Sequence, residues 1–241
     1  MKIIFVFAHP DDESFSSGGT IAKFKKSGAT VKLITATRGE EGATNEICKK
    51  EDLGITREKE LKNAAKILGI DQIFFLGFKD GTLTKIPKNT LKNKILKIIK
   101  RENPDVVVTF DKNGGSNHPD HITISQSCTN AFMEFSKLSK KRVALYHTAI
   151  PQSYLAKYKK SSIEYKFFGE MIGTPDNEIT TVVDIKNTYA KKIKALMCHK
   201  TQAKDVERYL KRAKLVNLKK NSSNWYPRIH LLNSSHCSFY C

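Results

Sequence analysis

The sequence alternates short apolar runs with longer segments in which apolar residues recur at the spacing of a helix. The apolar runs, each of which predicts a strand, are Lys2 to Ala8, Thr30 to Ala36, Gln72 to Leu76, Asp105 to Phe110 and Arg142 to His147. The intervening segments, which predict helices, are Gly19 to Lys26, Arg57 to Leu68, Thr90 to Lys100 and Ile122 to Phe135. This alternation favours right-handed crossover connections, and therefore an α/β fold with a mostly parallel sheet that helices cover on both faces.

The chain is less regular after the fifth apolar run. Pro151 to Asp176 contains several aromatic residues and predicts an insertion or a lid over the site. Glu178 to Ile185 then predicts another strand, and Asn187 to His199 predicts another helix. The last residues, Asn221 to Cys241, have poor periodicity and are assigned no role.

Length and composition predict one globular domain. With 241 residues, 39% of them hydrophobic and 27% charged, the chain can form one sizeable core. The apolar runs are far shorter than the roughly 18 residues that a membrane span needs, and the first strand leads into acidic residues without a cleavage site for a signal peptide. The five cysteines form no CxxC pair, which is typical of reduced thiols. We therefore expect a soluble, cytoplasmic protein with no membrane span.

The formal net charge of +18 is compatible with a nucleic acid, an anionic membrane surface or a phosphorylated substrate as partner. The lysines, however, are spread through almost every predicted helix and seldom alternate with aromatic residues. This pattern favours a solvated lysine-rich surface, and we expect no nucleic-acid partner.

Two clusters of histidine and carboxylate residues lie at the ends of predicted strands. The first is His9-Pro10-Asp11-Asp12-Glu13, and the second is His118-Pro119-Asp120-His121. In open parallel sheets, ligands bind at the carboxyl ends of the strands, so the clusters predict two halves of one metal site. Three ligands would come from His9, from one of the two aspartates, and from His118 or His121. The other aspartate would then be free to act as the general base toward a metal-activated water.

Glu13 is predicted only to favour the start of a helix, at the helix's positive end. An alternative in which Gly18-Gly19 before a helix forms a phosphate loop is weaker. The sequence contains neither GxGxxG nor GxxxxGK[ST], so nucleotide binding has little support. It also lacks the GxSxG motif of serine hydrolases.

The motifs together resemble those of the LmbE-like (PIG-L) de-N-acetylases in order and spacing. The matching segments are Ala8 to Glu13, Thr37 to Gly42, Leu76 to Gly81, Asp111 to His121 and, later, His199 to Gln202. The resemblance extends from about Met1 to Gln202. It predicts a deacetylase domain over residues 1–205 and a carboxyl-terminal extension of uncertain structure over residues 206–241.

The resemblance implies a Rossmann-like fold and zinc-dependent hydrolysis of an N-acetyl group, usually on a glucosamine moiety. It implies that His9, Asp12 and His121 bind zinc and that Asp11 is the general base. It further implies that His118 stabilises the oxyanion or protonates the departing amine, and that Arg57 and Asp80 contact the substrate. Fe²⁺, Co²⁺ or Mn²⁺ could also occupy such a site.

One position departs from the family pattern. Ser116 stands where some members have a tyrosine that polarises the substrate carbonyl, so the oxyanion would depend mainly on the metal and His118. We therefore expect a small-molecule or glycoconjugate substrate, in a protein that could be a homo-oligomer. Two alternatives stay open: an amidase that removes a larger acyl group from a sugar or thiol conjugate, and a non-catalytic nucleic-acid-binding protein on the same scaffold.

Overall fold

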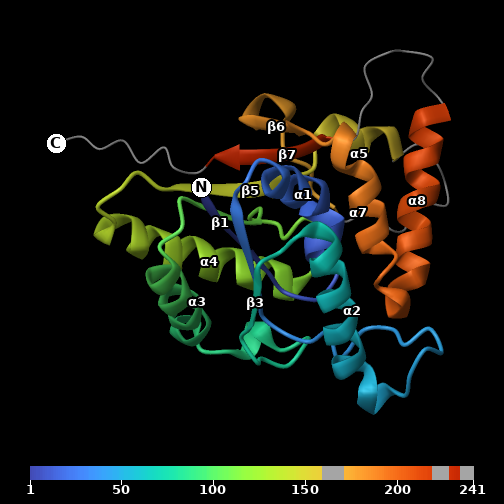
Figure 1. Ribbon diagram of the computed structural model, residues 1–241, viewed down its shortest axis with the longest axis horizontal. Coiled ribbons are helices and arrows are strands. Elements are labelled where there is room, and N and C mark those ends of the chain that lie inside the picture. The colour runs from blue at the N-terminus through green and yellow to red at the C-terminus, as the bar shows by residue number, and fades with distance from the viewer. Residues whose placement is uncertain (159–170, 219–227, 234–241) are drawn as a thin grey trace.

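The computed structural model describes residues 1–158, 171–218 and 228–233 and contains one sheet with seven strands (Figure 1). The strands follow the spatial order β3-β2-β1-β4-β5-β7-β6. Their bounds are β1 Lys2–Phe7, β2 Thr30–Thr35, β3 Gln72–Phe75, β4 Val106–Phe110, β5 Ala144–Ala149, β6 Thr181–Asp184 and β7 Arg228–Asn233. Strands β1 to β5 are parallel, whereas β7 is antiparallel to both of its neighbours.

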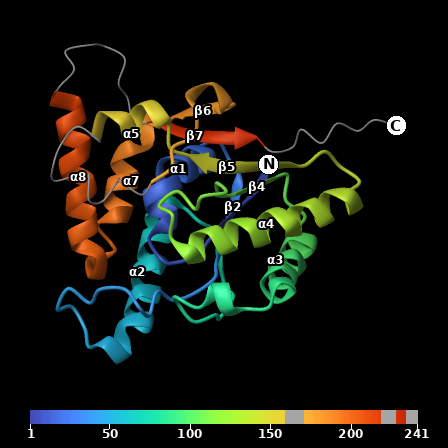
Figure 2. The same ribbon diagram turned by 180° about the vertical axis from the view of Figure 1, so that it is seen from behind.

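Helices cover both faces of this sheet. Their bounds are α1 Gly18–Lys26, α2 Leu53–Leu68, α3 Lys88–Glu102, α4 Pro119–Leu138, α5 Gln152–Tyr158, α7 Tyr189–Leu196 and α8 Ala203–Leu218. Helices α3 and α4 pack together on one face, and α1, α2 and α7 pack together on the other, as the two opposite views show (Figures 1 and 2). The predicted single-domain α/β fold is confirmed.

Strand β1 lies in the middle of the parallel strands and is buried on both sides. Ile3, Ile4, Phe5, Val6 and Phe7 are each at most 1% exposed. An uninterrupted apolar run is the sequence pattern that such a strand requires, since neither face meets water. The residues that follow β1 therefore leave the core at the edge of the sheet where the other parallel strands also end.

The predicted strands and helices lie within a few residues of the observed ones, but α5, α8 and β7 have no predicted counterpart. Helix α7 is shorter than the predicted Asn187 to His199, because the 3₁₀ turn Lys186–Thr188 replaces its first residues and the helix ends at Leu196. Strand β7 was not predicted, and it inserts between β5 and β6. The suggested domain boundary after residue 205 falls within α8, and the division of the chain there stays a prediction.

Within the described ranges, no helix is long and apolar enough to cross a membrane. The expected lid over Pro151 to Asp176 is described only at its two ends, because residues 159–170 lie outside the described residues. Those ends pair with each other through a bridge between Pro151 and Thr174.

Candidate metal centre and active site

The two predicted clusters lie together at the carboxyl edge of the sheet. Strand β1 ends at Phe7, two residues before His9, and its parallel neighbour β4 ends at Phe110. A loop then leads from β4 to His118, which is the residue before the first turn of α4, and Pro119 occupies that first turn. Proline is favourable there because its missing N–H has no partner in a helix start.

Three side chains from these clusters converge. His9 Nδ1 lies 3.1 Å from His121 Nε2 and 3.5 Å from Asp12 Oδ2, and His121 Nε2 lies 3.2 Å from Asp12 Oδ1. Ligands of a tetrahedral zinc ion, with bonds of about 2.0–2.1 Å, lie about 3.3 Å apart. The spacing of these three residues therefore fits one small divalent ion.

The partners of the two histidines decide which nitrogen of each faces this centre. His121 Nδ1 lies 3.0 Å from the carbonyl oxygen of Gly114, which can only accept a hydrogen bond. His9 Nε2 lies 2.8 Å from Asp80 Oδ1. When a cation binds, His9 Nδ1 and His121 Nε2 must be free of protons, because only an unprotonated ring nitrogen is a ligand, and these two nitrogens and Asp12 face the same point. Three lone pairs then converge, an arrangement that a cation stabilises.

Asp12 is held in place by the backbone at the end of β1. Its Oδ2 accepts hydrogen bonds from His9 N at 2.8 Å and from Ala8 N at 3.2 Å. Although burial favours the neutral acid, the charge of His121 and the hydrogen bonds to both histidines hold the pKa of Asp12 well below its usual value. Asp12 is therefore a carboxylate, which is the form that binds a metal.

Asp11 lies beside this centre in a different environment. Its backbone has a φ of 100°, and Arg57 Nη2 lies 3.1 Å from its Oδ2. Burial raises the pKa of Asp11 to about 6, against the opposing charge of Arg57. A carboxylate with a pKa near neutrality is suited to accept a proton as a general base.

Arg57 is buried and binds the protein itself. Besides Asp11, its guanidinium donates to Pro10 O at 2.5 Å and to Gly39 O at 2.9 Å, and the residue is 4% exposed. Asp80 is similar, because its second oxygen accepts a hydrogen bond from Glu41 N at 3.0 Å. The structure therefore brings both predicted substrate-binding residues to the site, but their charged groups contact Asp11 and His9.

His118 is exposed at the mouth of the site. Its Nδ1 accepts a hydrogen bond from Asp120 N at 3.2 Å, and its ring centroid lies 5.0 Å from that of His9. Burial of part of the ring, together with the neighbouring charges of His121 and His9, lowers the pKa of His118. The neutral ring must then carry its proton on Nε2, where it can donate to an oxyanion. A set of His9, His118 and His121 also has ligand atoms within 4.8 Å of one another.

The sequence analysis assigned no role to Asp120 and gave Glu13 only a role at the helix start. Asp120 is 1% exposed, accepts hydrogen bonds from Gly81 N and Leu83 N, and lies 3.4 Å from His9 Nε2. Glu13 is 1% exposed and turns inward to His199. Their positions inside the two motifs were the available signal, since a buried carboxylate requires a partner.

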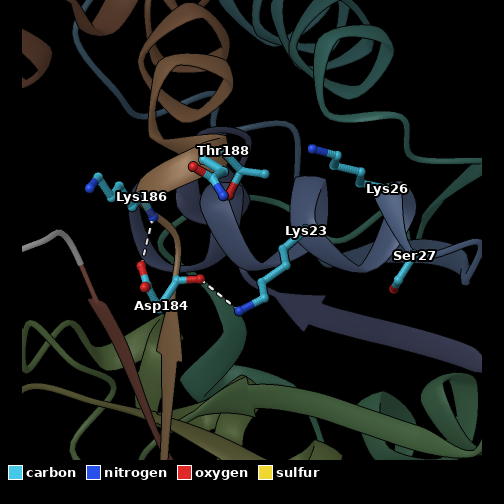
Figure 3. A pocket seen from close by; sticks show the side chains of 7 residues that line it. Lys23, Lys26, Ser27, Asp184, Lys186 and Thr188 are labelled. Atoms are coloured by element: carbon cyan, nitrogen blue, oxygen red, sulfur yellow. Dashed lines mark hydrogen bonds between the residues drawn. The ribbon is translucent and has the colours of Figure 1, made fainter.

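A separate surface pocket lies between α1 and the connection from β6 to α7 (Figure 3). Lys23, Lys26 and Lys186 are among its lining residues. Figure 3 shows the Lys23 ammonium group turned toward the Asp184 carbonyl oxygen, 2.8 Å away. This pocket contains none of the predicted site residues.

The fold and the site define an α/β protein with a candidate His and Asp metal centre at the edge of its sheet. Residues 4–132 match the family model described as PIG-L, GlcNAc-PI de-N-acetylase. The chain is 34% identical over 244 residues to 1D-myo-inositol 2-acetamido-2-deoxy-alpha-D-glucopyranoside deacetylase of Thermomonospora curvata, with 83% of this chain and 80% of that protein covered. The protein of the same name from Mycobacteroides abscessus is 34% identical over 230 residues, with 83% and 81% covered. The chain belongs to the PIG-L (LmbE-like) family.

Solved structures share the fold. N,N'-diacetylchitobiose deacetylase of Pyrococcus horikoshii is 24% identical with a TM-score of 0.64, covering 83% of this chain and 70% of that one. GalB, the 4-carboxy-2-hydroxymuconate hydratase of Pseudomonas putida, is 20% identical with a TM-score of 0.68, covering 97% and 95%. Because the two names describe different reactions, the fold alone does not select the chemistry, and the site must do so.

Proposed function

We propose that this protein is a zinc-dependent hydrolase that removes the N-acetyl group from a small N-acetylglucosamine-containing molecule and releases acetate and a free amine. The observation that carries the proposal is the convergence of His9, Asp12 and His121 next to Asp11, a partly buried carboxylate whose pKa is about 6. The names of the relatives support a glucosaminyl-inositol as the substrate class.

In this proposal, His9, Asp12 and His121 hold the ion. Zinc bound there would acidify a water molecule and polarise the acetyl carbonyl. Fe²⁺, Co²⁺ or Mn²⁺ could replace it, since all bind mixed His and carboxylate sites.

Asp11 accepts a proton from the water that attacks the acetamide carbon. His118 donates a hydrogen bond from Nε2 to the oxygen that becomes negative as the carbon becomes tetrahedral. The C–N bond then breaks as the proton held by Asp11 passes to the departing nitrogen, so that acetate and a free amine are released and Asp11 is again a carboxylate. Arg57 supports this chemistry by binding Asp11 Oδ2 and Pro10 O, and Asp80 supports it by orienting His9.

Replacement of Asp11 tests the proposal. We expect Asp11→Asn to lower the rate of acetate release by about 10²- to 10⁴-fold, the range typical of a lost general base, with the zinc content unchanged. Acetate is measured with N-acetylglucosaminyl-inositol, N-acetylglucosamine and diacetylchitobiose, and zinc by elemental analysis. The matched control is Asp205→Asn, whose exposed carboxylate pairs with Arg208 on α8 and should leave turnover unchanged.

Two outcomes would contradict the proposal. Undiminished turnover in Asp11→Asn would remove Asp11 from the proton transfer. A wild-type protein that releases longer acids but no acetate from a series of acyl glucosaminides would favour the amidase alternative.

A cytoplasmic location, a homo-oligomer and the absence of a nucleic-acid partner stay predictions of the sequence.

A further inference from the structure

A buried contact joins the far end of the chain to the first cluster. His199 follows α7, is 0% exposed, and places Nε2 3.0 Å from Glu13 Oε1, 186 positions earlier in the chain. Ser14 Oγ lies 3.4 Å from the same nitrogen. His199 Nδ1 has no hydrogen-bond partner among the described residues. The ring therefore makes its hydrogen bonds through Nε2, and the shorter of the two contacts is with Glu13.

Glu13 contacts Asp11 as well as His199. Its other oxygen, Oε2, accepts a hydrogen bond from Asp11 N at 3.0 Å. The φ of Asp11 is 100°, a strained conformation for a residue with a side chain, which persists only where several contacts enforce it. The carbonyl oxygen of Asp11 accepts from Ser14 N and Phe15 N, both at 2.9 Å. Glu13 therefore binds the backbone N–H of Asp11, a strained residue whose carbonyl oxygen already accepts two hydrogen bonds.

Electrostatics make Glu13 dependent on His199. Glu13 is 1% exposed and is a close neighbour of Asp11 and Asp12, so an ionised Glu13 without a cation would be an unpaired buried charge. Although burial of His199 favours its neutral ring, the charge of Glu13 and the hydrogen bond to it raise the pKa of His199. Removal of the ring would therefore free Glu13 to turn away from Asp11.

We propose that His199 is a positioning residue for Asp11 and acts through Glu13: the ring fixes the Glu13 carboxylate, which holds the Asp11 backbone in the conformation in which the Asp11 side chain meets Arg57. This inference rests on the proposed hydrolase function for its kinetic consequence. Its structural consequence, the dependence of the Asp11 backbone on His199, does not require a particular substrate.

Two substitutions of His199 separate positioning from packing. We expect His199→Leu to lower kcat by about 10- to 100-fold, the range found for lost support of a site residue, with KM changed less than about twofold and zinc content unchanged. His199→Gln, which retains one N–H donor of similar reach, should recover most of the lost rate. Thr201→Val is the matched control, because it removes a side-chain hydrogen bond from the same segment, from Thr201 Oγ1 to Glu60 Oε2 at 2.6 Å, and none to Glu13. It should lower the melting temperature without changing kcat.

A double variant tests the route through Glu13 and protects the test from misfolding. Glu13→Gln/His199→Leu buries no unpaired carboxylate, and its kcat should be no lower than that of the worse single variant, because both changes break the same chain of contacts. Multiplying losses would contradict the proposal. A wild-type kcat in zinc-loaded His199→Leu would also contradict the proposal. If His199→Leu does not fold, a wild-type kcat in the zinc-loaded double variant would contradict it.

Crystal structures of the wild type and the double variant give a readout that does not depend on activity. The φ of Asp11 should leave its value of 100° when His199 and Glu13 are replaced. An unchanged Asp11 backbone would overturn the positioning role even if the wild type shows no acetate release. Failure of the proposed function and failure of this inference are thereby distinguished.

Discussion

Lys192 lies on the inner side of α7 with its ammonium group enclosed by protein. The residue is 4% exposed, its Nζ donates to the carbonyl oxygen of Phe15 at 2.6 Å, and the ring of Tyr209 lies 4.9 Å away. Burial lowers the pKa of Lys192 to about 7. Since Phe15 belongs to the π-helical turn Glu13–Ser17, this lysine stabilises the turn that follows Asp11, the proposed general base, and Asp12, the proposed metal ligand.

The buried lysine predicts a specific pH dependence of stability. Between pH 7 and 10 the unfolded chain, with a lysine pKa of 10.5, binds one more proton than the folded state, so Lys192 makes folding more favourable as pH rises. Lys192→Met removes this contribution. The difference in unfolding free energy, variant minus wild type, should therefore fall by about 1.4 kcal/mol per pH unit in this range.

Urea unfolding of both proteins at pH 7.5, 8.5 and 9.5 measures this difference, and groups that titrate alike in both cancel. A difference independent of pH would show that the lysine keeps an ordinary pKa in the folded protein. The constant part of the difference reports the hydrogen bond to Phe15 and the packing of the methionine.

At the scale of elements, the loop from β4 to α4 determines the position of His121. Gly114 in this loop has a φ of 66°, and its carbonyl oxygen accepts the hydrogen bond from His121 Nδ1. A Cβ at Gly114 would lie 2.6 Å from the Cβ of His121 and 2.8 Å from the backbone nitrogen of Ile122. The loop therefore approaches the first turn of α4 as closely as a residue without a side chain permits.

We expect Gly114→Ala to displace His121 and to weaken zinc binding by about 10-fold or more. Gly28→Ala is the matched control, because Gly28 also has a positive φ, 83°, but nothing within 4 Å of an added Cβ. It should cost about 1 kcal/mol of stability from backbone strain and leave zinc affinity unchanged. Zinc affinity is measured by competition with a chelator. Equal affinity in Gly114→Ala and wild type would contradict the role of this close approach.

At the scale of the whole molecule, the metal centre joins two distant parts of the chain. His9 and Asp12 follow β1, whereas His121 lies in the first turn of α4, more than a hundred residues later. An ion bound by the folded protein and not by the unfolded chain adds its binding free energy to folding. The metal should therefore stabilise the fold as well as serve the reaction.

Removal of the metal should lower the melting temperature. Zinc at 100 times its dissociation constant stabilises by about 2.7 kcal/mol, which corresponds to about 5–10 °C for a chain of this size. Calorimetry with and without a chelator measures the shift. His121→Ala, which lacks one ligand, should show a much smaller shift, and an equal shift in this variant would place the stabilising ion elsewhere.

The parallel strands and their helices could be predicted because apolar periodicity is a local property of the chain. Strand β7 could not, since Arg228–Asn233 has no distinctive pattern and depends on an edge that β5 and β6 provide. The two clusters follow β1 and β4, which are far apart in the sequence. Their meeting could still be predicted, because the functional residues of α/β sheets gather at the carboxyl ends of the strands.

By itself, the sequence determined the fold class and the two clusters, because residue type and short-range pattern specify burial and the ends of strands. Only the tertiary structure decided which partner each polar side chain has. It turned Arg57 and Asp80 inward to Asp11 and His9, and it brought Glu13 to His199. The physical reason is that two residues far apart in the sequence can form a hydrogen bond only when the chain between them has folded and brought them together. No local sequence pattern encodes that geometry.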